Sequence, residues 1–70
     1  MNKETLKKQL DEAERYVSRG KQRVTRKCEF IAKLERDNQD TTSARKLLNL
    51  LITVQLANER RRDRLSRELG

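Results

Sequence analysis

The sequence predicts an all-α fold: an antiparallel hairpin of two long helices, which we expect to dimerise into a four-helix bundle. Three observations support the hairpin. Small and apolar residues recur at alternating spacings of four and three through the first half of the chain, proline is absent, and glycine occurs only at positions 20 and 70. A four–three repeat keeps one face of a helix against a partner helix, and few helix breakers interrupt either half.

The first predicted helix covers about residues 3–36. Inside this helix Gly20 costs about 1 kcal/mol relative to alanine. Two interpretations of Gly20 stay open: it lets a backbone or a large side chain come close, or it is a neutral exposed position. Lys27 interrupts the apolar repeat, and a polar residue there can set the register of the helix pair. The nine positions of the repeat are Leu6, Leu10, Ala13, Val17, Gly20, Val24, Lys27, Ile31 and Leu34.

The chain is predicted to turn at about residues 37–40, where residues with non-helical preferences cluster. Asn38 tolerates the left-handed backbone conformation that closes a helix. Asp40 or Thr41 can accept hydrogen bonds from the free amides at the start of the next helix, which is predicted at about residues 41–68. The short connection makes the two helices antiparallel neighbours and makes residues 1–70 a single helical-hairpin domain.

A turn centred near Asn38 and Gln39 predicts which residues face each other across the hairpin. Asn58 and Arg61 would then interrupt an otherwise apolar seam, and polar residues in such positions can set register and oligomeric state. The expected facing pairs are Leu34 with Ala44, Ile31 with Leu47, Val24 with Val54, Gly20 with Asn58, Val17 with Arg61, Ala13 with Leu65, and Leu10 with Leu69.

The apolar surface near the turn is wider than one partner helix covers. At 100° per residue, apolar side chains of residues 47–57 cover about 220° of the helix surface. Residues 28–34 spread over a comparable arc, in which Phe30 is expected to be buried. We therefore expect a homodimer that forms through the halves next to the turn. The residues expected in this contact are Phe30, Ile31, Leu34, Leu47, Leu48, Leu50, Leu51, Ile52 and Val54.

The chain is basic, with a net charge of +7, and the excess lies in two segments. Residues 15–27 hold six basic side chains and no acidic one, and residues 60–67 hold five arginines and one aspartate. The predicted pairing brings both segments to the same level of the hairpin, where they form a basic belt. Its candidate polyanion-binding residues are Arg15, Arg19, Arg23, Arg26, Arg60, Arg61, Arg62 and Arg64.

Three interpretations of the basic belt stay open. Clustered arginines bind the backbone of RNA or DNA by releasing counterions and gripping phosphate oxygens in pairs. An acidic protein or an anionic membrane surface is a second class of partner. The third is a solvated face in which nearby carboxylates neutralise the arginines. Base-specific recognition is not predicted, because Tyr16 is the one aromatic residue near the belt. The carboxylates available for pairing are Glu14, Glu29, Glu59, Asp63 and Glu68.

The composition argues against an enzyme. The chain has no histidine and one cysteine, and its carboxylates are scattered among basic residues. We therefore predict no catalytic residue, no cofactor, no metal site and no small-molecule substrate. Cys28 is expected to be a small buried residue. A redox-sensitive contact across a dimer is the alternative, because Arg26 and Lys27 favour its thiolate.

The chain lacks the sequence features of membrane and secreted proteins. Its first five residues have no apolar core of the kind found in signal peptides, and the longest apolar-rich stretch, residues 47–57, is far below the roughly 20 residues that span a bilayer. We therefore expect a cytoplasmic protein. Charged residues make up 41% of the chain, which is typical of disorder, but the helical periodicity of both halves favours an ordered structure.

Several segments carry a resemblance to known proteins. They are the stretch 34–42 with Ala44, Arg45, Leu47 and Leu48 after it, the ending Arg62-Asp63-Arg64-Leu65 with Arg67-Glu68-Leu69, and Ala13-Glu14-Arg15. In these segments the chain resembles a family of short bacterial α-helical hairpin (coiled-coil) proteins of unknown function. The resemblance implies a glycine where Asn38 stands, which is consistent with a helix-closing position. It supports the hairpin and implies no activity.

Taken together, the patterns predict a self-associating hairpin that acts as a protein-interaction or scaffold module. The alternative is a non-specific nucleic-acid-binding protein that uses the basic belt. Salt dependence separates these two functions, because binding through phosphate contacts weakens steeply as salt is added.

Overall fold

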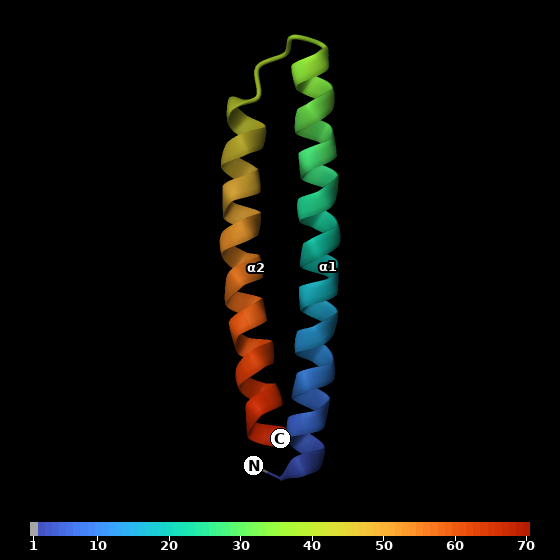
Figure 1. The fold of residues 1–70 in the computed structure, drawn as a ribbon, viewed down its shortest axis with the longest axis vertical. Helices are drawn as coiled ribbons and strands as arrows, with labels where there is room; N and C mark the ends of the chain where they lie inside the picture. Colours follow the sequence, from blue (N-terminus) through green and yellow to red (C-terminus); the bar gives the residue numbers. More distant parts are fainter. Residues whose placement is uncertain (1) are drawn as a thin grey trace.

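The computed structural model describes residues 2–70 as two α-helices joined by a short turn (Figure 1). Helix α1 spans Lys3–Arg36, and helix α2 spans Thr42–Leu69. They run antiparallel, side by side, in a rod whose Cα extents are 54 × 14 × 14 Å. Residues 2–70 contain no strand. The predicted all-helical fold with two packed helices is therefore confirmed.

The turn ends α1 through backbone hydrogen bonds around Asn38. This residue has a φ of 55°, in the left-handed region. The Gln39 amide donates to the Leu34 carbonyl at 2.8 Å, and the Asn38 amide donates to the Glu35 carbonyl at 3.1 Å. These two bonds form a Schellman motif, which satisfies carbonyls that the end of a helix leaves without partners. Asn38 therefore closes α1, as the sequence predicted.

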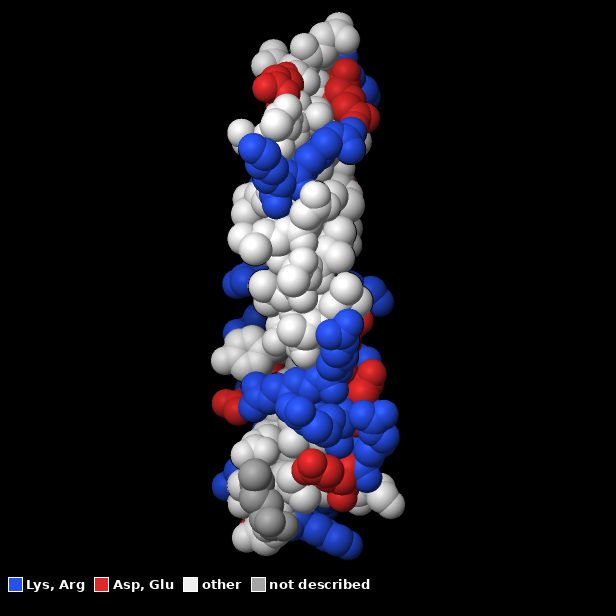
Figure 2. All heavy atoms as spheres, turned by 90° about the vertical axis from the view of Figure 1, so that its left-hand side faces the viewer, with Lys and Arg blue, Asp and Glu red and all other residues white. Residues whose placement is uncertain are grey.

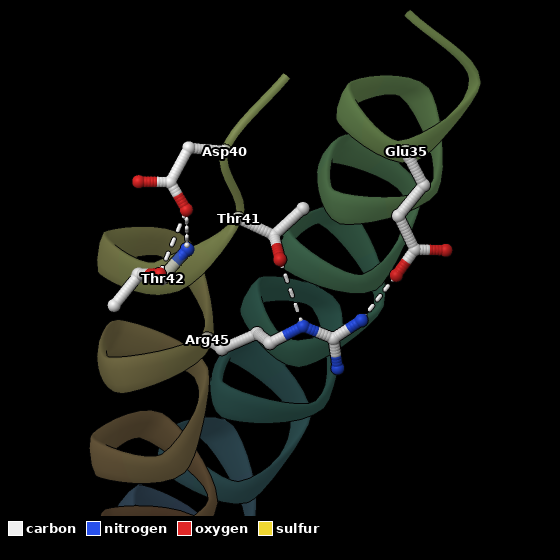
Figure 3. Close-up of polar contacts among 5 residues, drawn as sticks. All are labelled: Glu35, Asp40, Thr41, Thr42 and Arg45. Carbon is white, nitrogen blue, oxygen red and sulfur yellow. Dashed lines mark hydrogen bonds and ion pairs between the residues drawn. The ribbon is translucent and has the colours of Figure 1, made fainter. Parts of the chain in front are cut away.

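Side chains of the turn start α2 and tie it to α1 (Figure 3). Asp40 Oδ1 accepts hydrogen bonds from the hydroxyl of Thr42 at 2.7 Å and from its amide at 3.0 Å. These bonds, the hydroxyl one first, lower the pKa of Asp40 because they favour its charged form. The Arg45 guanidinium donates to Thr41 Oγ1 at 2.9 Å and also pairs with Glu35 of α1. Of the two predicted capping residues, Asp40 is the one that caps.

The four–three repeat of α1 faces α2 along the whole rod. All nine positions of the repeat are buried or half-buried, including Gly20 and Lys27. The Lys27 ammonium lies 5.1 Å from the centre of the Phe30 ring, so the charged end leaves the seam along an aromatic face. The opposing seam of α2 has the same spacing and consists of Ala44, Leu48, Leu51, Gln55, Asn58, Arg62, Leu65 and Leu69.

The predicted pairing is right at the open end of the hairpin and wrong for three residues of α2. Leu6, Ala13 and Leu65 form a buried cluster with Leu10 and Leu69 packed against it, as expected. One residue along a helix turns a side chain by about 100°. A shift of one residue along α2 therefore brings a different set of side chains to face α1. The predicted facing residues Leu47, Val54 and Arg61 are exposed, and the adjacent Leu48, Gln55 and Arg62 face α1 instead.

Two further expectations about burial are wrong. Phe30 is 48% exposed, and Cys28 is exposed as well. Both residues lie beside the narrow face of α1 that carries the repeat. Because a single partner helix covers only this face, the flanking side chains stay in contact with solvent.

Candidate self-association surface and basic belt

A polar contact between Gln55 and Gly20 forms the middle of the seam. The Gln55 side chain crosses from α2 to α1 and is only 8% exposed. Its Nε2 donates to the Val17 carbonyl at 2.8 Å. A Cβ atom on Gly20 would lie 1.8 Å from Gln55 Oε1, so the glycine makes room for the amide. Of the two interpretations of Gly20, the close approach of a large side chain is therefore correct.

The Gln55 carbonyl oxygen has an unusual environment. Oε1 is buried and has no N–H or O–H donor within residues 2–70. It lies on the side of Gly20 where a Cβ atom would be, 1.8 Å from that position. An α-hydrogen of Gly20 therefore points toward this oxygen, which is the geometry of a weak Cα–H···O contact. The contact ties one register of α2 to one position on α1.

Apolar side chains cover most of the surface of α2 between residues 47 and 58. These twelve residues include no charged side chain, and Figure 2, which views the α2 side of the rod, shows a white band between basic regions. Leu50 is the most exposed of its large apolar side chains, at 61%. The apolar side chains of this segment extend beyond the one side of α2 that α1 covers. The large exposed apolar side chains of the segment are Leu47, Leu50, Ile52, Val54 and Leu56.

The nine residues expected in self-association divide into two groups. Ile31, Leu34, Leu48 and Leu51 are buried or half-buried in the seam of the hairpin itself. The exposed group is Phe30, Leu47, Leu50, Ile52 and Val54. Leu56 was missed, although its spacing of four from Ile52 is the signal that places both on one flank of α2.

A groove with a volume of about 420 Å³ lies between the helices on the flank that carries Val54. It brings together three of the candidate arginines, Arg19, Arg23 and Arg61, beside Tyr16. No carboxylate lines it. We call it the basic groove. Its lining residues are Tyr16, Arg19, Gly20, Arg23, Leu51, Val54, Gln55, Asn58 and Arg61.

A second groove of about 350 Å³ lies on the other flank of the seam. Ile52 and Leu56 line it from α2, together with Glu59 and Arg62, and Lys21 lines it from α1. Its charge is mixed, because Glu59 accompanies the two basic residues. The two flanks therefore differ in charge, and the basic groove lies on one of them only.

Few arginines of the basic belt are neutralised by carboxylates. Residues 2–70 contain two ion pairs, Glu35 with Arg45 near the turn and Asp63 with Arg62 at 3.0 Å. Of the five carboxylates that the sequence offered as partners for the belt, only Asp63 is within pairing distance of an arginine. Seven of the eight candidate arginines are therefore unpaired in the described part of the chain, and these seven are exposed. Figure 2 shows a basic cluster on the α2 side, next to the white band.

Residues 2–70 contain neither a cluster of metal-ligating side chains nor a membrane-spanning helix. Between residues 2 and 70, no three His, Cys, Asp or Glu side chains lie close enough together to hold a metal ion. Neither described helix has an apolar stretch long enough to cross a membrane. Comparison with protein-family models, curated proteins and solved structures gave no match. The resemblance to short bacterial hairpin proteins therefore stays a prediction.

Proposed function

We propose that the protein is a self-associating helical hairpin that serves as a protein-interaction or scaffold module. In this proposal two copies join through the turn-proximal halves and form a four-helix bundle. The observation that supports it most is the charge-free segment 47–58, whose apolar side chains are exposed on both flanks of the seam. Exposed apolar patches of this kind mark interaction sites.

The exposed area supports the same proposal. The hairpin has a solvent-accessible surface of 5729 Å², whereas a compact monomer of this mass exposes about 4,600 Å². A standard interface buries about 800 Å² on each partner. That is roughly one-seventh of the surface of this chain, so the exposed flank of one rod is large enough to supply it.

A second copy is the partner we propose for this surface. A twofold axis would place segment 47–58 of one copy against the same segment of the other. Neither copy then brings a charged side chain into the contact from residues 47–58. Burying an unpaired charge is strongly unfavourable, so a charge-free partner is the one that such a surface accepts.

Sedimentation equilibrium tests the self-association. We expect a species of twice the chain mass of 8.3 kDa at micromolar concentration. Leu50→Glu should raise the dissociation constant by at least about 30-fold, because it places a charge in the buried contact. Asn49→Glu is the matched control: it adds the same charge one residue away, about 100° around α2, and should have little effect.

The result that would end the proposal is a folded monomer of 8.3 kDa across the micromolar range. Circular dichroism on the same samples shows whether each variant keeps its helical structure. If Leu50→Glu loses its helicity, an exposed alternative on the same flank, Val54→Glu, replaces it in the comparison.

A specific observation also favours a second function, the binding of a nucleic-acid backbone. Seven belt arginines lack carboxylate partners in residues 2–70 and are exposed on both helices. Unpaired guanidinium groups keep their full charge for phosphate oxygens, and binding releases the counterions condensed on the polyanion. The belt would recognise the charge of the phosphate backbone and not the base sequence.

Titration of labelled single-stranded and duplex oligonucleotides at several salt concentrations tests this second function. We expect affinity to fall steeply with salt, and the double variant Arg60→Glu, Arg61→Glu to weaken binding at low salt by at least about 10-fold. The double variant Lys7→Glu, Lys8→Glu makes the same change in charge outside the belt and should weaken binding far less. Absence of binding at low salt would exclude the second function.

A further inference from the structure

We propose that the two copies pair antiparallel, and that the acidic turn of each copy docks at the basic groove of the other. The proposal rests on the self-association proposed above and adds its orientation and a partner for the basic groove. The acidic turn is residues 35–40, which carry Glu35, Asp37 and Asp40 against one basic residue, Arg36. The basic groove carries three guanidinium groups and no carboxylate.

Charge repulsion disfavours the parallel arrangement. The two basic segments overlap along the rod, since Arg19 and Arg23 of α1 line the same groove as Arg61 of α2, and most of their arginines are unpaired within residues 2–70. Parallel copies would place two such belts side by side at a helix-packing distance of about 10 Å. This separation is close to the Debye length of about 8 Å at physiological salt, so salt would not screen the repulsion fully.

An antiparallel pair separates the α2 arginines of the two belts and keeps the apolar contact. Suppose the twofold axis passes near Leu50, the most exposed large apolar residue of the described chain. With a rise of 1.5 Å per residue, the two copies of Arg61 then lie about 33 Å apart along the rod, several Debye lengths away. Gln39, which lies between Asp37 and Asp40 eleven residues before Leu50, comes level with Arg61 of the basic groove of the other copy, eleven residues after it.

Glu35 of the turn is paired with Arg45, and the other two carboxylates, Asp37 and Asp40, are available to such a partner. Asp40 uses Oδ1 for its contacts with Thr42, and its other oxygen points away from the helix (Figure 3). Asp37 is exposed and has no ion-pair partner among residues 2–70. The hydrogen bonds from Thr42 lower the pKa of Asp40 because they favour its charged form.

The charges also select the flank of the rod. The groove on the opposite flank includes Glu59, which would repel an acidic turn. The basic groove has no carboxylate, and it is continuous with the apolar flank, since Val54 belongs to both. Leu47 and Leu50 precede Val54 on that flank at helical spacing. The apolar contact and the charge contact therefore lie on one face of the molecule.

Distances between spin labels test the orientation directly. Cys28 is the one cysteine in the chain and is exposed, so it takes a label without any substitution. Cys28 lies close to the level of the proposed axis and should give a short distance between copies, under about 25 Å, in either orientation. A label at the turn, Gln39→Cys with Cys28→Ser, should give about 33 Å or more if the copies are antiparallel.

The two labels separate the possible failures. A distance below about 20 Å at position 39 would establish parallel pairing and overturn the orientation, while the dimer itself stands. Loss of dipolar coupling at both positions, with a monomer mass by sedimentation, would overturn the self-association as well. Sedimentation of each labelled sample checks that the label has not dissociated the dimer.

A double-mutant cycle tests the docked turn. Asp37→Arg and Arg61→Glu should each raise the dissociation constant of the dimer by about 5- to 10-fold at low salt, and the double variant should recover most of the loss. Additive losses would overturn the contact. If Arg61→Glu tightens the dimer while abolishing oligonucleotide binding, the groove belongs to nucleic acid and not to the second copy.

Discussion

Single residues decide where this chain turns and where its helices touch. Asn38 closes α1 because its backbone adopts the left-handed conformation, and it is the only non-glycine residue in the described chain with a positive φ. Gly20 accepts the Gln55 amide because it has no side chain. Both roles depend on backbone geometry and space, so conservative-looking substitutions at these positions should have measurable effects on stability.

Substitution of Asn38 tests its role in the turn. Glycine adopts the left-handed conformation without the penalty of a Cβ atom, so Asn38→Gly should raise the free energy of unfolding by up to about 1 kcal/mol. Asn38→Ala should lower it by about 1–2 kcal/mol. Urea unfolding at one fixed protein concentration measures both changes. Gln39→Ala, at the next residue, should stay within about 0.5 kcal/mol of the wild type.

The Asn38 prediction has a clear contrary outcome. Equal stabilities of the glycine and alanine variants would mean that the left-handed conformation of residue 38 contributes nothing to the turn. The Schellman hydrogen bonds to Leu34 and Glu35 would then have to persist without it.

At the scale of the helices, the two elements differ in how clearly the sequence marks their inner face. In α1 the repeat lies between polar and charged residues, so the sequence alone predicts which face of α1 packs against α2. In α2 the segment 47–58 is apolar on most sides, so hydrophobicity does not mark its inner face. The four–three spacing from Ala44 to Leu69 was present, but Gln55, Asn58 and Arg62 occupy three of its positions.

We expect the register of the helix pair to depend on the contact between Gly20 and Gln55. Alanine is favoured over glycine by about 1 kcal/mol inside an ordinary helix. Here Gly20→Ala should destabilise the protein, because its Cβ would displace the Gln55 amide from its bond to Val17. In a Gln55→Ala background the same substitution should stabilise by about 1 kcal/mol, since the obstacle is gone.

Urea unfolding of the four proteins in this cycle measures the change of sign. If Gly20→Ala stabilises both backgrounds equally, the close approach of Gln55 contributes nothing to the free energy of unfolding. The register of α2 would then have to come from the apolar cluster of Leu6, Ala13 and Leu65 at the open end.

At the scale of the whole molecule, the monomer has a small core and two kinds of exposed surface. In the described chain only Leu6, Ala13, Val17, Ile31, Ala44 and Leu65 are buried hydrophobic residues. A core of this size is marginal for an independent domain, and association adds burial that the hairpin lacks. In an assembled form, stability would therefore follow protein concentration. The exposed apolar segment and the basic belt then become parts of one proposed contact, with the acidic turn as the third part.

The structure shows which of the predicted site residues are exposed, and their roles stay predictions. The sequence placed an apolar surface near the turn and a belt at its far side, and both are exposed in the structure. It did not separate the apolar residues that α1 covers, such as Leu48 and Leu51, from those left exposed, such as Leu50 and Leu56. Nor did it show that most belt arginines lack carboxylate partners in residues 2–70, because side-chain geometry decides pairing.

Local patterns alone were enough for the helices, the turn at Asn38, the inner face of α1 and the two basic segments. These features depend on backbone preferences, on periodicity and on the positions of charges along the chain. The inner face of α2 could be known only from the tertiary structure. It depends on whether a side chain 35 positions away, Gln55, fits the space that Gly20 leaves. Such a fit is a match of shapes between distant residues, and no local pattern records it.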